Sequence, residues 1–431
     1  MHDQTARQVR APSRAVPAER SGDGSRSVLV LSAHRGQLDR RIVAETNALA
    51  DSGRGVTLVS LPAYIADGML SRSVRVVMPG DPLTNDLMGA AELSLAHRVG
   101  RHLPGPLYRV GRYLWHRRPW PRRNPADRLV DLAPPGNFDA IHCHDADTLP
   151  AAVTLRRQRM PRAKIVYDSH ELFPFQFADS TLEKYWVRIE RQHIGEADAV
   201  ITVNDSVAHA MAALYGIAPP HVIYNSYGVK DQSGEGTLES FLRHFGAPPG
   251  GRRVLFQGMF HEGRNLETLV TGLAMLDSGV QLFMLGAGDE EEHLRRICRD
   301  RQSHNVFFGP LVRQDRLLSL TRQAELGMIP YLGDRLLNNR LCTPNKLFEF
   351  IEAGVPICAS DLPELRRIVR GHGIGDVYPM DSPGQIADAV RDCIRRRDAG
   401  EFGPNLAPAA DRFSWRRQAE VLLRLYDQLG V

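Results

Sequence analysis

The chain has 431 residues, of which 43% are apolar and 24% are charged, and its formal net charge is +4. This composition is typical of a soluble globular protein with enough apolar residues for two cores. The net charge is too small to indicate a nucleic-acid binder by itself, and no apolar run approaches membrane-spanning length, so any membrane contact must be peripheral.

The cysteine usage and the N-terminal residues indicate a cytoplasmic protein. Five cysteines are scattered without metal-ligand spacing: Cys143, Cys298, Cys342, Cys358 and Cys393. We therefore expect reduced thiols. Residues 1–26 are rich in Arg, Ser, Ala and Pro and lack the apolar core of a signal peptide, which predicts a disordered leader.

The first elements predict a parallel sheet. Apolar strands are expected at Val28–Leu31, Val56–Val59 and Val74–Val77, with a helical pattern through Ala44, Leu49 and Ala50 after the first strand. Strand, helix and strand in this succession form a βαβ unit.

The segment Arg98–Arg128 has a different composition. It holds nine arginines together with Tyr108, Tyr113, Trp115 and Trp120, and its only acid is Asp127. Aromatic rings among arginines suit a helix on an anionic membrane surface, where rings lie at headgroup depth. A pair of solvated connecting helices is the alternative, and a third interpretation, nucleic-acid binding, is disfavoured by the near-neutral overall charge.

Strand and helix patterns alternate again between residues 138 and 228. Each apolar strand there runs directly into polar residues, and in doubly wound sheets ligand groups gather at the carboxyl edge. We expect one rim to contain His142, His144, Asp145, Asp168, His170, Glu171, Asn204 and Asn225. A polar run within residues 229–250 predicts a linker, followed by a second alternating set from Val254 and a closing amphipathic helix.

The most informative stretch is Arg335–Glu364. Thr343 and Pro344 predict a hydroxyl cap followed by proline at the first helical position, and Gly354 ends the helix. Lys346 stands where a capping box would have Glu or Gln. A cation in the first turn opposes the helix dipole, so its position makes sense if an anion shares the site.

Further residues extend this predicted anion site. Glu349 lies about one turn beyond Lys346 on the same face, where it can accept hydrogen bonds from ribose hydroxyls. Arg264 closes the glycine-bearing loop Gly258–Gly263 at a second helix start, where a guanidinium can bind phosphate oxygens. These features predict a nucleotide diphosphate site. A surface Lys–Glu pair on an ordinary helix is the alternative reading of Lys346 and Glu349.

Two other chemistries are weaker hypotheses. Asp145 and Asp147 form an Asp-x-Asp pair that could hold a metal on a diphosphate, but the phosphate site is expected in the other domain. Cys143 could act as a nucleophile beside His and Asp, although a thiol buried in a strand is usually inert. We therefore expect no metal.

Several segments together resemble glycosyltransferase family 4, retaining enzymes with the two-domain GT-B architecture. They are DAIHCHDADTLP, VYDSHELFP, ADAVITVNDS, VIYNSYG, FQGMFHEGRNLETL, PNKLFEFIEAGVPICASDLPE and the closing FSW helix. The resemblance implies an α/β fold of two Rossmann-like doubly wound domains facing a cleft. The expected boundaries are 27–228 plus helix 414–431 for the acceptor domain and 251–413 for the donor domain.

The resemblance also implies roles for individual residues. Arg264 and Lys346 match positions that bind the diphosphate, and Glu349 matches the ribose position. His144 is taken as the active-site histidine that contacts the transferred sugar. Donor contacts are expected from Gly258, Gly263, Thr343, Pro344 and Asn345, and Asp168, His170 and Glu171 are the acceptor-side candidates. Leu341 replaces a family glutamate that contacts the donor sugar.

These implications predict a cytoplasmic, metal-independent hexosyltransferase. Its donor would be a UDP- or GDP-type sugar, and its acceptor a hydroxyl on a lipid-linked glycan or a small molecule. Peripheral membrane contact through Arg98–Arg128 is part of the same hypothesis. An inactive relative acting as a scaffold, suggested by Leu341, and a GT-B epimerase are the alternatives.

Overall fold

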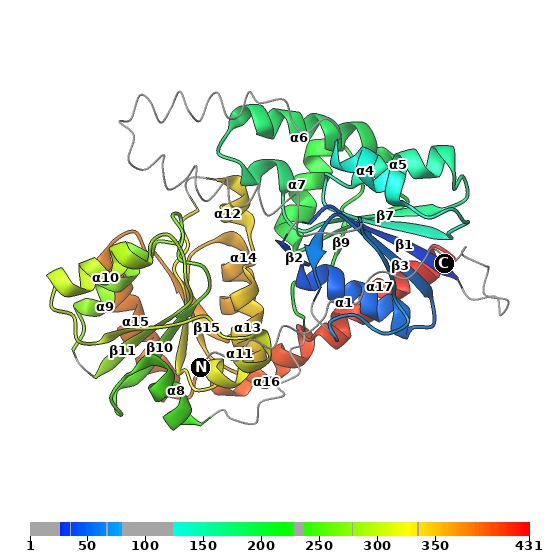
Figure 1. The fold of residues 1–431 in the computed structure, drawn as a ribbon. Helices are drawn as coiled ribbons and strands as arrows, with labels where there is room; N and C mark the ends of the chain where they lie inside the picture. Colours follow the sequence, from blue (N-terminus) through cyan, green and yellow to red (C-terminus); the bar gives the residue numbers. More distant parts are fainter. Residues whose placement is uncertain are drawn as a thin grey trace, which may run out of the picture. The chain divides into compact units, whose positions relative to one another are not determined.

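A computed structural model describes residues 26–34, 36–65, 68–79, 124–227, 237–277, 279–333 and 336–431. The chain divides into two compact units (Figure 1). The first extends to Asp168 and includes Glu196–Asp198 and Leu429–Val431, and the second comprises Ser169–Gly195 and Ala199–Gln428. The domain boundaries expected from the sequence stay predictions.

A seven-stranded sheet has the order β5-β3-β1-β6-β7-β8-β9. Its strands are β1 (Ser27–Ser32), β3 (Gly55–Ser60), β5 (Arg75–Val77), β6 (Ala140–His144), β7 (Lys164–Ser169), β8 (Ala199–Thr202) and β9 (His221–Val222). The strand pairs β1–β3, β1–β6 and β6–β7 are parallel. The strands expected from Val28, Val56 and Val74 are thereby confirmed.

Helices connect these strands, and capping residues fix where several of them begin. They are α1 (Arg40–Asp51), α4 (Pro125–Leu132), α5 (Leu149–Gln158), α6 (Ser180–His193) and α7 (Asp205–Tyr215), with short turns η1 (Phe173–Gln176) and η2 (Ile194–Glu196). The Asp39 carboxylate accepts a hydrogen bond from the Arg41 amide at the start of α1. Two short strands, β2 (Gly36–Gln37) and β4 (Ala63–Tyr64), form a separate parallel pair.

The six-stranded sheet of the second unit has the order β12-β11-β10-β13-β14-β15. Its strands are β10 (Arg252–Gln257), β11 (Val280–Leu285), β12 (Val306–Gly309), β13 (Leu326–Ile329), β14 (Ile357–Ser360) and β15 (Gly375–Tyr378). All five pairings are parallel. The sequence order of the strands reverses between β10 and β13, which makes this the topological switch point of a doubly wound sheet.

Helices cover this sheet on both faces. The helical segments from residue 238 onward are α8 (Leu238–Phe245), α9 (Leu266–Ala274), α10 (Glu291–Asp300), α11 (Gln314–Thr321), α12 (Leu337–Leu341), α13 (Asn345–Ala353), α14 (Pro363–Leu365), η3 (Arg366–Arg370), α15 (Pro383–Asp398), α16 (Gly403–Arg412) and α17 (Trp415–Gln428). Helix α9 contacts both α10 and α15, and helix α13 contacts both α11 and α16 (Figure 1). The predicted α/β class with two parallel sheets is confirmed.

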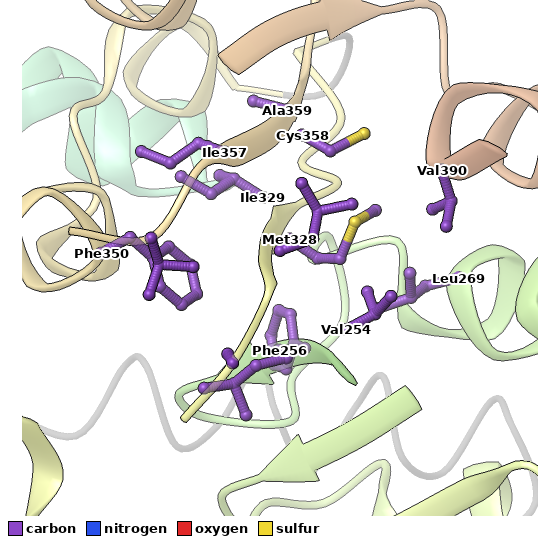
Figure 2. Close-up of a cluster of buried hydrophobic side chains, with 14 of the residues drawn as sticks. Val254, Phe256, Leu269, Met328, Ile329, Phe350, Ile357, Cys358, Ala359 and Val390 are labelled. Atoms are coloured by element: carbon purple, nitrogen blue, oxygen red, sulfur yellow. The ribbon is translucent and has the colours of Figure 1, made fainter. Parts of the chain in front are cut away.

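The core of the second unit forms where strand side chains meet α9, α13 and α15. Figure 2 shows Phe256, Met328 and Ile329 from the strands beside Leu269, Phe350 and Val390 from the helices. Phe256, Met328 and Phe350 are completely buried. Burying apolar side chains on both faces explains why these strands read as nearly continuous apolar runs.

The predicted start of the helix after Cys342 is wrong by one position. Pro344 is the N-cap rather than the first helical residue, since its ψ of 146° is extended, and α13 begins at Asn345 without a side-chain cap. Thr343 does not cap the helix; its hydroxyl accepts a hydrogen bond of 3.2 Å from the Asn204 amide. The helix does end at Gly354, whose φ of 70° is left-handed.

Several predictions concern residues outside the described part of the chain. The leader lies there except for Arg26, as do residues 98–123 of the Arg-rich segment and residues 228–236 of the predicted linker. Asn124–Arg128 begin α4, and α8 lies in the second half of that linker. Within the described ranges, every helix is too short or too polar to cross a membrane.

Gly327 on β13 offers a test of the packing in this core. A Cβ atom at Gly327 would lie 2.6 Å from the Phe350 ring, so Gly327→Ala should overpack the core and destabilise the second unit by about 1–3 kcal/mol. Urea and thermal unfolding measure the loss. Gly384→Ala is the control, because that position in α15 has open space around it and should lose nothing. Equal losses in the two variants would contradict the packing argument.

Candidate active site

The predicted donor residues meet at the switch point of the second sheet. β10 ends at Gln257 and continues into Gly258, whose φ of 128° favours glycine. The neighbouring strand β13 leads to Tyr331, and α13 brings Lys346 and Glu349 to the same place. In open α/β sheets, ligands bind at the carboxyl ends of the strands beside a switch point.

Lys346 is the most unusual side chain of this site. The residue is only 5% exposed, and its ammonium nitrogen lies 3.6 Å from the centroid of the Phe256 ring and 5.0 Å from that of Tyr331. Within the part of the chain that the structure describes, Nζ has no hydrogen-bond partner. A buried ammonium normally has acceptors for its three donors, so this position needs a ligand with acceptor atoms.

Arg264 supplies a second cation to the same site. Its guanidinium carbon lies 4.3 Å from the centroid of the Tyr331 ring, two residues before α9 begins. The pKa of Lys346 is lowered well below its usual range, mainly by burial and then by Arg264, while Glu349 raises it. Two basic side chains placed this close to each other favour the binding of an anion between them.

A short chain of hydrogen bonds fixes the Glu349 carboxylate. The Gln257 amide donates to Glu349 over 2.5 Å, and the Thr321 hydroxyl donates to the Gln257 amide oxygen over 2.8 Å. Gln257 and Thr321 are fully buried or nearly so. The carboxylate is therefore oriented by the core of the sheet and not by surface contacts alone.

Glycines allow the loops of this site to approach each other closely. A Cβ atom on Gly258 would lie 3.1 Å from the Lys346 ammonium, so a side chain there would compete with this cation for space. A Cβ atom on Gly286 would lie 1.9 Å from the Gly258 carbonyl oxygen. The Gly286–Gly288 turn thus serves close packing. Gly263, with a φ of 86°, turns the loop before Arg264.

The segment before α13 is held by partners within the second unit. The Asn204 amide donates to the Leu341 carbonyl over 2.8 Å, in addition to its bond to Thr343. The Asn338 amide donates to the Glu171 carboxylate, and the Leu172 amide donates to Asn338. Glu171 therefore has a defined structural partner.

The histidines and carboxylates of the first unit form a separate buried cluster. His144 is 2% exposed and its Nδ1 lies 3.2 Å from Asp168. Arg41 binds Asp168 through two hydrogen bonds of 2.7 and 2.8 Å. His142 lies 3.2 Å from Glu45 and stacks on His144 with ring centroids 4.5 Å apart.

Glu45, His142, His144 and Asp168 offer ligand atoms within 4.8 Å of one another, which is a set that could hold a metal. However, the Arg41 guanidinium already pairs with both carboxylates, at 2.7 Å from Asp168 and 3.2 Å from Glu45. A metal cation would have to share these carboxylates with a buried cation. The cluster is better described as an ion-pair network.

Comparisons with known proteins assign both halves of the chain. A family model described as "Glycosyltransferase Family 4" matches residues 63–228, and one described as "Glycosyl transferases group 1" matches residues 251–396. The chain is a family 4 glycosyltransferase.

Individual relatives agree with this family. A phosphatidyl-myo-inositol mannosyltransferase of Mycobacterium leprae is 29% identical over 70% of this chain and 76% of its own length. A D-inositol 3-phosphate glycosyltransferase of Mycobacterium bovis is 25% identical over 68% of this chain and 62% of its own length. The glycosyltransferase is thus an enzyme related to proteins named for inositol-containing substrates.

Solved structures share its fold. Sucrose-phosphate synthase from Thermosynechococcus elongatus has a TM-score of 0.65 at 16% identity and covers 94% of this chain and 99% of its own. Anabaena HepE, solved with UDP and glucose, has a TM-score of 0.64 at 15% identity and covers 94% of this chain and 100% of its own. These likenesses show the GT-B type of fold.

The structure brings together Gly258, Arg264, Lys346 and Glu349 of the predicted donor set in the second unit. It places His144 and Asp168 of the first unit in the buried network, and His170, which is partly exposed and belongs to the second unit, directly follows β7. The catalytic and acceptor roles stay predictions. Burial raises the pKa of the Cys143 thiol well above its usual range, so a thiolate nucleophile there is disfavoured.

Sequence reasoning missed Phe256, Gln257, Thr321 and Tyr331. Their residue types are ordinary for buried strands and helices, and only the folded sheet places them around Lys346 and Glu349. One signal was available: Gln257 is a polar residue at the end of an otherwise apolar strand, immediately before a glycine.

The ion-pair network of the glycosyltransferase yields a stability prediction. Asp168→Asn removes the closer of the two buried carboxylates that pair with Arg41 and should destabilise the first unit by about 3–5 kcal/mol, as measured by urea unfolding. Glu196→Gln removes a partly exposed partner of Arg156 and Arg157 and should cost less than about 1 kcal/mol. Similar losses for both variants would contradict a structural role for the Arg41–Asp168 pair.

Proposed function

We propose that this enzyme is a retaining glycosyltransferase that moves a hexose-type sugar from a UDP- or GDP-sugar to a hydroxyl acceptor. The observation that carries the proposal is the buried Lys346 ammonium, which has no hydrogen-bond acceptor among the described residues and lies beside Arg264. A diphosphate supplies both the negative charge and the acceptor atoms that this arrangement lacks.

The same residues support a mechanism for bond cleavage. Negative charge develops on the departing nucleoside diphosphate, and cations positioned in advance stabilise it. Lys346, Arg264 and the uncapped first turn of α13 can do this together. Because two side-chain cations are available for the leaving group, we propose that no metal is required.

Glu349 is proposed to bind the ribose of the donor. Its carboxylate is oriented by Gln257 and lies on the helix that carries Lys346, so it is suited to accept hydrogen bonds from neighbouring hydroxyls. Retention follows from the family resemblance. The engagement of Asp168 by Arg41 and of Glu171 by Asn338 favours front-face attack over a covalent carboxylate intermediate.

The acceptor is proposed to be an inositol-bearing or other glycolipid hydroxyl. The two curated relatives are named for phosphatidyl-myo-inositol and for inositol 3-phosphate, which makes these the first acceptors to test. His144, His170 and the acidic residues Asp168 and Glu171 stay the candidates on the acceptor side. A cytoplasmic enzyme that contacts the membrane through Arg98–Arg128 fits a lipid acceptor.

A donor and acceptor panel tests the function. Purified enzyme is incubated with GDP-mannose, UDP-glucose or UDP-N-acetylglucosamine, with phosphatidylinositol vesicles or inositol 3-phosphate, and products are identified by mass spectrometry. Sugar transfer, or slow donor hydrolysis without acceptor, supports the proposal. If UDP and GDP do not bind and no donor is consumed, the scaffold alternative replaces it; a changed donor sugar without transfer would indicate an epimerase.

Removal of either cation should slow turnover. Lys346→Ala and Arg264→Ala are each expected to lower kcat by about 10²–10³-fold, because each removes a preorganised charge from the leaving group. Lys164→Ala and Arg366→Ala are the matched controls, since both side chains are exposed and form surface ion pairs. Circular dichroism confirms folding, and near-normal turnover in both cation variants would refute the diphosphate site.

Glu349→Gln tests the ribose contact. The variant should weaken UDP or GDP binding by about tenfold, equivalent to about 1.4 kcal/mol, because an amide replaces a charged acceptor. The effect on the corresponding free nucleobase should be small, since it has no ribose. Isothermal titration calorimetry measures both affinities. An unchanged affinity for the nucleotide would exclude Glu349 from the ribose site.

A further inference from the structure

The enclosure of the Lys346 ammonium raises the question of its charge before the donor arrives. Its Nζ atom faces the rings of Phe256 and Tyr331, lies against Gly258, and has no hydrogen-bond acceptor within the described ranges. An ammonium in such a place has lost its water without gaining acceptors, whereas a neutral amine loses much less. The aromatic faces offset part of this loss through cation–π attraction.

The charged groups around Lys346 do not compensate for its burial. Arg264 repels an ammonium, and Glu349 attracts it but also accepts the Gln257 hydrogen bond. Cys342 and Tyr331 are the other titratable groups that face the site. Burial raises the pKa of Cys342 to about 11 and that of Tyr331 above its usual range, so both are uncharged near neutral pH.

We propose that Lys346 is a neutral amine in the nucleotide-free enzyme and takes up one proton when the donor diphosphate binds, so that donor binding is proton-linked. This inference rests on the proposed function and adds a regulatory property of the same site. The lone pair of Nζ accepts a proton from solvent as the diphosphate oxygens arrive to accept its hydrogen bonds. The proton returns to solvent when the nucleoside diphosphate leaves.

The linkage has a defined sign. The pKa of Lys346 is depressed in the free enzyme and rises when the anion binds. Between these two values, binding consumes a proton, so affinity should fall as pH rises, with a limiting slope of about tenfold per pH unit. A lysine that is already charged in the free enzyme gives no such slope near neutral pH.

Calorimetry measures the proton directly. UDP and GDP are titrated into the full-length enzyme at about pH 8, where the terminal phosphate, with a pKa of about 6, is already ionised. The titration is repeated in buffers with different ionisation enthalpies. The dependence of the binding enthalpy on the buffer enthalpy should correspond to an uptake of about one proton per nucleotide bound.

Lys346→Arg is the decisive variant, because a guanidinium keeps its charge and has no proton to take up. It should bind with no proton uptake and with an affinity that is flat over the same pH range. Lys164→Arg is the matched control; Lys164 is a partly exposed lysine that pairs with Asp198, and its variant should behave like the parent enzyme.

The outcomes separate this inference from the proposed function. Nucleotide binding without proton uptake between about pH 6 and pH 9, where a depressed lysine pKa would act, overturns the inference and leaves the function intact. Uptake that persists in Lys346→Arg also overturns it, because another group then takes the proton. If neither nucleotide binds, the proposed function fails and the inference fails with it. If Lys346→Arg does not bind nucleotide, the pH dependence of the parent enzyme's nucleotide affinity tests the inference. A fall of about tenfold per pH unit supports it, and a flat profile overturns it.

Discussion

The central physical constraint in this protein is the buried Lys346 side chain, whose Nζ atom has no hydrogen-bond acceptor among the residues that the structure describes. Lys346 lies under the Phe256 ring and beside Arg264, where burial opposes its charge and the second cation opposes it further. A folded chain tolerates such an arrangement at a site where binding of an anion recovers the cost. The glycines at 258 and 286, the loop before α9 and the start of α13 are all arranged around this position.

The sheet topology explains why the site lies where it does. β10 and β13 are neighbours although five elements, α9, β11, α10, β12 and α11, separate them in sequence, and the connections that follow the two strands run to opposite faces of the sheet. Gln257 and Gly258 come from one strand end and Tyr331 from the other. The buried ends of these strands hold the residues in place, and the Thr321–Gln257–Glu349 hydrogen bonds orient the carboxylate that is proposed to bind the ribose.

The buried polar residues of the first unit form an ion-pair network, and the catalytic and acceptor-side roles expected for them stay predictions. His144 and Asp168 follow apolar strands, as ligand-binding residues of doubly wound sheets do. In the structure both lie in a network with Arg41, and the network satisfies a carboxylate that would otherwise be costly to bury. His170, two residues beyond Asp168, is only partly buried, and the Arg41–Asp168 pair fixes the strand that leads to it.

The sequence by itself determined the fold class and the strands, and it predicted Arg264, Lys346 and Glu349 as donor residues, because strand–helix alternation, glycine turns and a lysine at a helix start are local patterns. It did not determine that Asp168 is paired with Arg41, that Pro344 lies outside its helix, or that Phe256, Gln257 and Tyr331 surround Lys346. Those features depend on residues that are far apart in the chain and meet only when the parallel strands assemble. Local propensity carries no information about contacts between residues far apart in the chain. Only the tertiary structure therefore decided the charge environment of Lys346, on which the proposed chemistry depends.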